Sequence, residues 1–253
     1  MDRQPYVRSE EKDGIAIIEF FHPAHNSLPG HLLADLRDQI IAEGYKNHIN
    51  IIFLKSGGDR TFCAGASFNE LASIKNQDEG KHFFMGFADV INAIRTCGKI
   101  VVGRIQGKTV GGGVGIAAAC DYAIATKYAS VKLSELAVGI GPFVIGPAVE
   151  RKIGLSAFSQ MALNATEWQT AQWAKSKGLF QEAFDSTEQM DEYIDHFLNI
   201  LNGSNPAALK ELKKVFWHNT DHWDQLLIER AQTSGRLVLS THARDAINGF
   251  LNA

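Results

Sequence analysis

The sequence lacks the features that mark secreted, membrane-spanning or nucleic-acid-binding proteins. It holds only three cysteines in 253 residues, and no stretch approaches the roughly eighteen uninterrupted apolar residues of a membrane helix. The first residues are polar with no apolar signal segment behind them, and a net charge of −3 with scattered Lys and Arg leaves no basic footprint for nucleic acid. We therefore expect a cytoplasmic protein that binds neither membrane nor nucleic acid.

The three cysteines form neither a disulfide framework nor a metal-ligand pattern. Cys63, Cys97 and Cys120 each lie in apolar surroundings, which indicates buried, reduced thiols without a chemical role. An apolar fraction of 45% and a charged fraction of 21% are those of an ordinary globular protein. The chain can therefore bury its core as one large domain, alone or with an appendage.

Alternating strand and helix patterns predict an α/β architecture with a largely parallel sheet. Short apolar, β-branched runs predict buried strands over 14–21, 50–55, 100–105 and 121–125. Apolar residues at helical spacing predict helices over 29–45, 79–96 and 112–119. Strands and helices thus take turns through the first half of the chain, as in folds built on a parallel sheet.

The pattern changes after residue 156, where helical segments follow one another. They are expected over 157–164, 167–177, 187–201, 206–216 and 223–240. The last segment carries Leu226, Leu227 and Ala231 among charged residues, so one of its faces should be apolar. Such a tail, without strands of its own, would pack on the α/β core or on another subunit.

Several familiar catalytic and cofactor motifs are missing. Gly107-Lys108-Thr109 ends like a phosphate-binding loop, but Gly103 leaves three residues before Gly107 where that motif needs four. The histidine pairs 22/25 and 218/222 have no neighbouring Glu in the zincin pattern, and no Gly-x-Ser-x-Gly elbow is present. We therefore expect no metal site, no phosphate-binding loop and no serine hydrolase.

What remains is a combination of backbone donors and one carboxylate. The small-residue segment 62–71 follows the expected strand ending at Lys55, and the glycine-rich turn Gly111–Gly115 follows the one ending at Ile105. Two turns after neighbouring parallel strands place their N–H groups at the same end of a sheet. With Glu135 twenty residues further on, they predict proton transfer beside a carbonyl, since the enolate oxygen must be held while the proton moves.

These residues resemble the crotonase, or enoyl-CoA hydratase/isomerase, superfamily over nearly the whole chain. The agreement runs in order through Gly14-Ile-Ala-Ile-Ile-Glu19, His25-Asn-Ser-Leu28, Thr61-Phe-Cys-Ala-Gly-Ala66, Val110-Gly-Gly-Gly-Val-Gly115, Leu133-Ser-Glu-Leu136 and Ala243-Arg-Asp-Ala-Ile-Asn-Gly-Phe250. The resemblance implies an α/β spiral of ββα units with a helical C-terminal region. It further implies a core over 1–195, a helical trimerisation region over 196–253, and a homotrimer or a dimer of trimers.

The resemblance also assigns roles to individual residues. The backbone N–H groups of Ala66 and Gly112 would bind the thioester carbonyl of an acyl-CoA substrate, and Glu135 would move the proton. Coenzyme A is then part of the substrate, and no separate cofactor is expected. The residues expected to line the substrate site are Ala24, Leu28, Ala64, Gly65, Gly111, Gly115, Phe143 and Phe250, the last from a neighbouring region or subunit, with a pocket floor from 71–87.

Two departures from the family pattern leave the reaction open. Typical hydratases carry a Glu where this chain has Gly115 and an Asp where it has Ser67. One base suffices to isomerise a 3-enoyl to a 2-enoyl thioester, whereas hydration uses two carboxylates. The run from Gly111 to Asp121 nevertheless resembles methylglutaconyl-CoA-type hydratases of branched-chain degradation, so hydration of a short or medium 2-enoyl thioester is the leading expectation. Isomerisation and a non-catalytic acyl-CoA-binding scaffold are the alternatives.

Overall fold

The computed structural model describes residues 4–251, and within this range the chain alternates between two β-sheets. The larger sheet has six strands in the order β1 (Tyr6–Lys12), β2 (Ile15–Phe21), β3 (Ile51–Ser56), β5 (Ile100–Ile105), β7 (Tyr122–Thr126) and β10 (Glu182–Phe184). The smaller sheet has four, in the order β4 (Thr61–Cys63), β6 (Lys108–Val110), β8 (Ser130–Lys132) and β9 (Gln169–Thr170). β1 and β9 run antiparallel to their neighbours, and the other paired strands run parallel.

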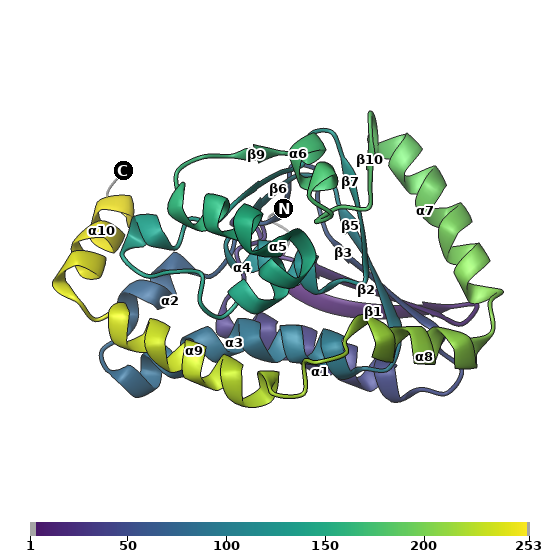
Figure 1. Cartoon of the computed structure of the whole chain (residues 1–253), viewed down its shortest axis with the longest axis horizontal. Helices are drawn as coiled ribbons and strands as arrows, with labels where there is room; N and C mark the ends of the chain where they lie inside the picture. Colours follow the sequence, from purple (N-terminus) through teal and green to yellow (C-terminus); the bar gives the residue numbers. More distant parts are fainter. Residues whose placement is uncertain (1–3, 252–253) are drawn as a thin grey trace.

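Each of β3, β5 and β7 in the larger sheet is followed directly by a strand of the smaller sheet, namely β4, β6 and β8. Helices then return the chain to the larger sheet. The helices are α1 (Gly30–Tyr45), α2 (Phe68–Ser73), α3 (Gln77–Thr96), α4 (Gly112–Ala119), α5 (Gly146–Leu163), α6 (Ala171–Ser176), α7 (Thr187–Asn202), α8 (Pro206–Phe216), α9 (Trp223–Leu237) and α10 (Thr241–Leu251), with a 3-10 turn η1 (Leu136–Val138). This spiral of ββα units with a helical C-terminal region confirms the expected fold (Figure 1).

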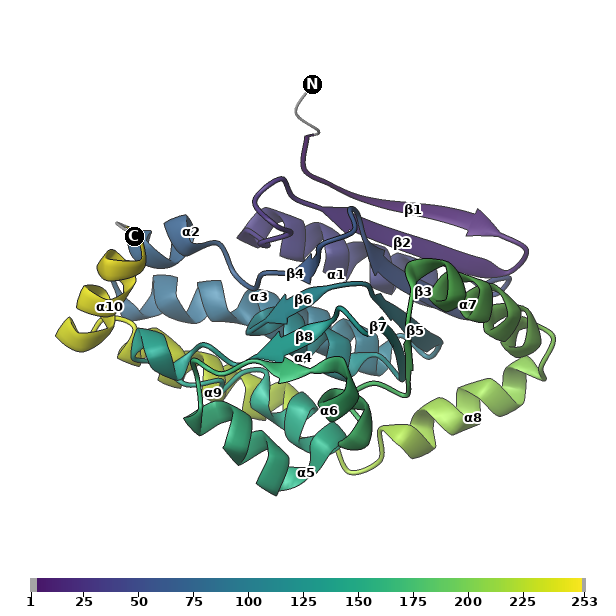
Figure 2. The same cartoon turned by 90° about the horizontal axis from the view of Figure 1, so that it is seen from above.

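Both faces of the larger sheet are covered, which explains why its strands read as continuous apolar runs. In β3, Ile52 and Leu54 join the main hydrophobic core with α1 and α3, whereas Ile51 and Phe53 face the opposite way. That second face packs mainly against α7, and Leu209 of the following helix α8 joins the same cluster (Figures 1 and 2). Alternate residues of one strand therefore belong to two separate cores.

Two expectations for the second half of the chain are wrong. The segment 157–164 is only the end of α5, which begins at Gly146 and contains a break at Gly154, where φ is +76°. The segment 167–177 holds β9 before α6, and β10 follows, so this region does contribute strands. Strands of two and three residues are too short to show a period of two in the sequence, which is why they escaped prediction.

The C-terminal helices pack back on the core of their own chain. α9 lies antiparallel to α3, because Arg95 at the end of α3 donates to Asp224 at the start of α9, while Gly80 meets Gly235 at the opposite ends. An added Cβ on Gly80 would lie 2.7 Å from the Gly235 Cα, so the two backbones touch. The expected division at residues 195 and 196 falls inside α7, so a boundary there would cut a continuous helix.

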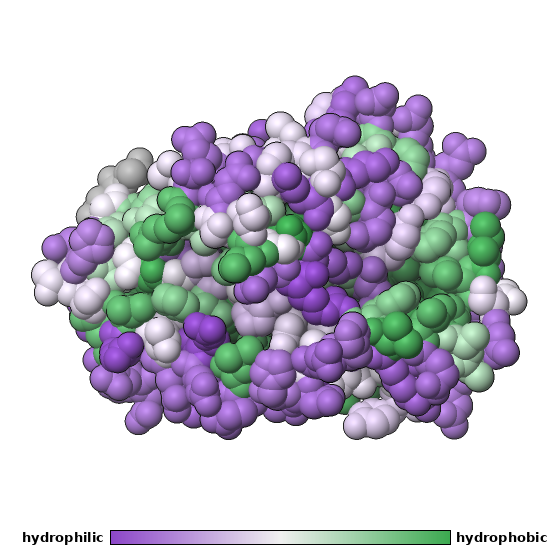
Figure 3. Space-filling model, in the orientation of Figure 1, coloured by the Kyte–Doolittle hydropathy of each residue, from purple (hydrophilic) through white to green (hydrophobic). Residues whose placement is uncertain are grey.

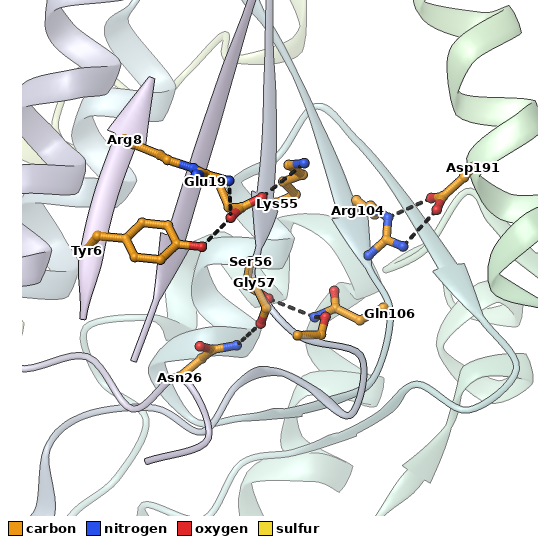
Figure 4. A network of polar contacts seen from close by, with 11 residues as sticks. Tyr6, Arg8, Glu19, Asn26, Lys55, Ser56, Gly57, Arg104, Gln106 and Asp191 are labelled. Carbon is orange, nitrogen blue, oxygen red and sulfur yellow. Dashed lines mark hydrogen bonds and ion pairs between the residues drawn. The ribbon is translucent and has the colours of Figure 1, made fainter. Parts of the chain in front are cut away.

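A polar network ties the ends of the large-sheet strands together (Figure 4). The Glu19 carboxylate accepts from Tyr6 and from Arg8 at 2.9 Å, and it pairs with Lys55 at 3.0 Å. On β5, Arg104 donates to both oxygens of an aspartate in α7, at 2.6 and 2.9 Å. The network fixes β1 and α7 to the central strands.

The surface of the molecule carries both polar and apolar regions. Figure 3 shows polar residues over most of one face, with apolar side chains gathered toward its two ends. At one of these ends, α8 exposes Leu212, Val215 and Phe216. None of the helices within residues 4–251 is both long and apolar enough to cross a membrane. All three cysteines are unpaired, with Cys63 and Cys120 buried and Cys97 partly buried.

A buried ion pair joins α8 to the sheet. Asp121 accepts from the Val101 N–H at 2.7 Å, from Lys213 Nζ at 2.6 Å and from Trp217 Nε1 at 2.8 Å. The side chains of Asp121 and Lys213 are 2% and 3% exposed, so neither charge can be solvated if its partner is removed.

Lys213→Ala should therefore lower the free energy of unfolding by about 3–5 kcal/mol, because it leaves a carboxylate buried without its cation. Lys214 provides a matched control, since it also pairs with a glutamate at 2.6 Å but both side chains are more than half exposed. Lys214→Ala should cost less than about 0.5 kcal/mol. Urea denaturation of both variants measures the difference, and equal losses would contradict the assigned role of the buried pair.

Candidate active site

Three neighbouring strands of the smaller sheet end at the same place. β4, β6 and β8 run parallel, and Ala66, Gly112 and Glu135 follow their last residues by two or three positions. The carboxyl ends of adjacent parallel strands meet at one edge of a sheet, which is where ligands bind in α/β folds. The sequence prediction placed the donor turns after the larger-sheet strands. The structure corrects this, because the short strands β4 and β6 lie between.

The two donor loops touch each other. Gly65 has φ of +88°, and an added Cβ there would lie 3.1 Å from the Val110 carbonyl oxygen and 3.8 Å from the Gly112 nitrogen. The Gly65 carbonyl accepts from Leu28 N–H at 2.8 Å, which fixes the loop to the segment before α1. Within residues 4–251, neither the Ala66 N–H nor the Gly112 N–H donates to an acceptor, so both remain available to a ligand.

The glycine-rich turn can be followed residue by residue. Gly111 has φ of +52° and donates its N–H to the Lys132 carbonyl at 2.9 Å, which holds the turn beside the end of β8. Gly112 begins α4 under the ring of Phe87, where an added Cβ would lie only 2.3 Å from a ring carbon. Close packing of this ring therefore requires glycine and leaves the first N–H of the helix uncovered.

Glu135 directs its carboxylate to this turn. An added Cβ on Gly111 would lie 2.9 Å from Glu135 Oε1, so the carboxylate rests against the Gly111 backbone. The residue as a whole is partly exposed, but its Oε2 atom is buried and has no hydrogen-bond partner within residues 4–251. Burial raises the pKa of the Glu135 carboxyl to about 7, and the residue's own N–H opposes this rise only in part.

A cavity of about 670 Å³, counted with its open mouth, connects the donors and the carboxylate. Its walls are mostly aromatic and aliphatic, and its only polar side chains among residues 4–251 are Ser134, Glu135 and Ser234. The other lining residues are Ala64, Gly65, Ala66, Phe68, Leu71, Phe83, Phe84, Phe87, Val110, Gly111, Gly112, Val138, Ile140, Gly141, Pro142, Phe143, Val144 and Ile145. No Lys, Arg or His contributes to this set, and Glu135 is its sole titratable side chain.

The structure brings most of the predicted site residues to this cavity. Ala66, Gly112 and Glu135 line it, as do Ala64, Gly65, Gly111 and Phe143. The pocket floor expected from 71–87 is also found there, through Leu71 and three phenylalanines of α3.

Four predicted lining residues lie elsewhere. The Leu28 side chain is fully buried in the main core, so only its backbone reaches the site, by pairing with Ala66. Gly115 is covered by Ile145, whose Cγ2 would lie 2.5 Å from an added Cβ. Ala24 is exposed and does not line the cavity. Phe250 is 55% exposed and packs on Phe68, with ring centroids 5.9 Å apart, outside the cavity.

Sequence reasoning missed the contribution of α9. Ser234 is 1% exposed and lines the cavity, whereas the sequence pattern predicted only an apolar packing face for this helix. The signal was present, because Ser234 follows Leu227 and Ala231 at helical spacing. A polar residue on an otherwise apolar stripe marks a buried position of unusual chemistry.

Nucleophilic and metal-based chemistry have little support here. Cys63 lies beside the donor loop and accepts from the Gly65 N–H at 3.4 Å, but burial raises the pKa of its thiol to about 12. Within residues 4–251 no group of three or more His, Cys, Asp or Glu side chains could hold a metal ion. The arrangement is therefore one of two backbone N–H groups and one buried carboxylate oxygen, all at the edge of the same cavity.

The sequence profile of the enoyl-CoA hydratase/isomerase family matches residues 10–251. The chain belongs to this family. Members of the enoyl-CoA hydratase/isomerase family are expected to bind acyl-CoA thioesters, and the resemblance stated from the sequence motifs is thereby confirmed.

Relatives with different reactions match this enoyl-CoA hydratase/isomerase family member. The peroxisomal Delta(3,5)-Delta(2,4)-dienoyl-CoA isomerase of Arabidopsis thaliana is 29% identical over 216 residues, which is 79% of this chain and 76% of that protein. The short-chain-enoyl-CoA hydratase of Clostridium acetobutylicum is 26% identical over 246 residues, 95% of this chain and 93% of that protein. The crystal structure of enoyl-CoA hydratase from Bacillus halodurans shares the fold, with a TM-score of 0.89 at 23% identity over 96% of this chain and 99% of that one.

The raised pKa of Glu135 predicts a pH-dependent cost to stability. Its carboxyl loses a proton near its ordinary pKa of 4.5 when unfolded, but only near 7 when folded. The folded state therefore loses up to about 3 kcal/mol relative to the unfolded state as the pH rises from below 4.5 to above 7. Glu135→Gln should remove this loss, so the variant should gain stability over the wild type across that interval. Urea denaturation at several pH values measures the gain, and a pH-independent difference would contradict the buried carboxylate.

Proposed function

We propose that this protein is an enoyl-CoA isomerase that shifts a double bond from C3 to C2 of an acyl thioester, with Glu135 as its single base. The observation that carries the proposal is that Glu135 is the sole titratable side chain lining the cavity within residues 4–251. Isomerisation needs one group that takes a proton from one carbon and returns it to another. Hydration needs, in addition, a second group that holds and activates a water molecule.

The proposed reaction uses each part of the site. The thioester carbonyl oxygen accepts hydrogen bonds from the N–H groups of Ala66 and Gly112, and the Glu135 carboxylate removes a proton from C2. The electrons of the broken C–H bond form a dienolate, whose oxygen the two donors stabilise. Protonation at C4 by the Glu135 carboxyl then leaves the double bond between C2 and C3 and restores the carbonyl and the carboxylate.

The acid strength of Glu135 suits this cycle. A pKa of about 7 means that the group is a stronger base than an ordinary carboxylate and still gives its proton back readily at neutral pH. Its unpaired Oε2 also leaves it free of partners that would compete with the substrate proton.

The acyl group is proposed to be uncharged. A methylglutaconyl group carries a carboxylate, and this cavity offers no Lys, Arg or His among residues 4–251 to pair with it. Burying an unpaired carboxylate is strongly unfavourable. The walls formed by Phe83, Phe84 and Phe143 instead favour an apolar acyl chain of short or medium length.

Hydration of a 2-enoyl thioester is the second candidate. The match to the short-chain-enoyl-CoA hydratase of Clostridium acetobutylicum over nearly the whole chain favours it. The position of the missing second carboxylate argues the other way, because Gly115 is shielded by Ile145. The Ser134 hydroxyl, next to Glu135, is the remaining side chain that could hold a water at this end of the cavity.

A homotrimer or dimer of trimers also stays a proposal. Its support is the apolar surface that a single chain leaves exposed, including Leu155 and Leu163 on α5 and Val215 on α8. Contact between subunits would cover such side chains.

Purified protein incubated with 3-hexenoyl-CoA, crotonyl-CoA and methylglutaconyl-CoA distinguishes these functions. We expect 3-hexenoyl-CoA to be converted to its conjugated isomer, with no hydration of the other two. Hydration of crotonyl-CoA or methylglutaconyl-CoA without isomerisation would establish the hydratase instead. Binding of all three without any product would support a non-catalytic scaffold.

Glu135→Gln should lower kcat by about 10²–10⁴, which is the usual contribution of a positioned general base. Binding of the unreactive butyryl-CoA, measured by calorimetry, should change little, since the amide keeps the size of the side chain. Glu150→Gln is the matched control, because Glu150 is exposed on α5 outside the cavity. Normal turnover in Glu135→Gln would reject the assigned base.

The pH profile gives an independent check. Because the ionised carboxylate is the active form, kcat/KM should rise with pH and reach half its plateau near pH 7, the pKa of Glu135 in the folded protein. Stopped assays with 3-hexenoyl-CoA from pH 5 to 9 would measure it. A profile that falls over this range would show that the protonated carboxyl is required in the free enzyme.

A further inference from the structure

Two serines line the cavity without a part in the proposed reaction, and of these Ser134 is next to Glu135 whereas Ser234 comes from a different helix. Ser234 lies on α9, is 1% exposed, and faces a space whose other walls, apart from Ser134 and Glu135, are apolar or glycine within residues 4–251. Serines within helices often bond to the carbonyl one turn earlier, as the neighbouring Thr233 does with Glu229 at 3.0 Å. The Ser234 hydroxyl makes no hydrogen bond to any residue in the described range.

Ser234 is held far from the reacting end of the cavity. Phe87 of α3 covers Gly112, which marks the thioester end, whereas Gly80 of α3 contacts Gly235, next to Ser234. Seven residues of α3 separate these two contacts, which corresponds to about 10 Å along the helix axis. Ser234 therefore lies toward the N-terminal end of α3, away from Phe87, and the cavity-lining residues Phe83 and Phe84 come from the stretch of α3 between the two contacts.

The position of Ser234 is rigid. An added Cβ on Gly235 would lie 2.5 Å from the Lys81 nitrogen, so α9 is already in backbone contact with α3 and cannot move closer. Directly after the last residue of α9, Val238 is buried in a cluster with Leu71 and Val138, and these two residues line the cavity. The Ser234 hydroxyl therefore faces the cavity from a helix that is held by backbone contact with α3 and by the packing of Val238 at its C-terminal end.

The Ser234 hydroxyl has no partner among residues 4–251, and a ligand that displaced water from the cavity without supplying one would leave this hydroxyl unsatisfied, which is unfavourable. Because no Lys, Arg or His among residues 4–251 lines the cavity, a carboxylate on the ligand would be left there without a cationic partner. We propose that Ser234 is a specificity-determining residue that hydrogen-bonds an uncharged hydroxyl or carbonyl oxygen carried by the acyl chain several carbons beyond the thioester. This inference rests on the proposed function, in that the cavity holds the acyl chain of a CoA thioester.

Calorimetric titration with saturated thioesters tests it without any turnover. The ligands are hexanoyl-CoA and its three hydroxylated derivatives, which carry a hydroxyl on C4, C5 or C6 and are isomers of one another. For at least one hydroxylated isomer, Ser234→Ala should weaken binding about tenfold, the usual effect of losing one buried hydrogen bond. Its effect on hexanoyl-CoA should be less than about twofold, because alanine removes no contact with an apolar chain.

Two further variants separate specificity from structure. Thr233→Ala removes the adjacent hydroxyl, which bonds to the helix backbone, and should leave every ligand unaffected. Ser234→Cys keeps nearly the same volume with a much weaker donor, so it should behave like Ser234→Ala. Equal weakening of hexanoyl-CoA and all hydroxylated isomers, or no change in any, would overturn the role of Ser234. Failure of the wild type to bind any acyl-CoA would instead reject the proposed function itself.

Discussion

The structure depends on how the small parallel sheet brings three chain segments to one edge. β4, β6 and β8 contribute only three residues each, yet each delivers one element of the site directly after its last residue. Strand pairing fixes their ends side by side, and Gly65, Gly111 and Gly112 let the loops approach within contact distance. The donors therefore need no ligand to be arranged. Such prior arrangement is what makes backbone N–H groups effective toward a developing negative charge.

The electrostatic character of the site follows from what surrounds it. Aromatic side chains of α3 and apolar residues after η1 line the cavity, and no Lys, Arg or His among residues 4–251 lies in this lining beside Glu135. Burial alone then accounts for a carboxyl that titrates near neutrality. Stability and chemistry are opposed at this point, because the ionised form that acts as a base is the form that burial disfavours.

Much of this could be predicted from the sequence, for identifiable reasons. The strands β2, β3, β5 and β7 are apolar on both faces, and α3 and α8 have periodic faces bounded by caps, so composition and spacing revealed them. The glycine-rich turn and Glu135 stood out in the sequence because glycine and a lone carboxylate are chemically distinctive, whereas the assignment of the donors to Ala66 and Gly112 came from the family resemblance. The short strands β4 and β6 were not found, since three residues carry no period, and the donors were therefore assigned to the wrong sheet.

Tertiary contacts account for the remaining differences. Leu28 and Gly115 sit in motifs typical of the site, but their surroundings are set by Ala66 and Ile145, which are distant in the sequence. Ser234 shows the reverse case, where a residue outside every motif reaches the cavity because α9 returns to α3. The local pattern of α9 marks Ser234 as a buried position, but it does not say which distant segment the helix packs against.

The contact between Gly80 and Gly235 also bears on biosynthesis. Part of the cavity lining comes from α3, near the end of the first third of the chain, and Ser234 of α9 adds to it from the last tenth. A growing chain on the ribosome therefore has an incomplete apolar cavity until α9 has been synthesised. Aromatic surface exposed for that interval invites association with other unfinished chains. Packing of α9 on α3 therefore also ends the period in which the incomplete cavity can promote aggregation.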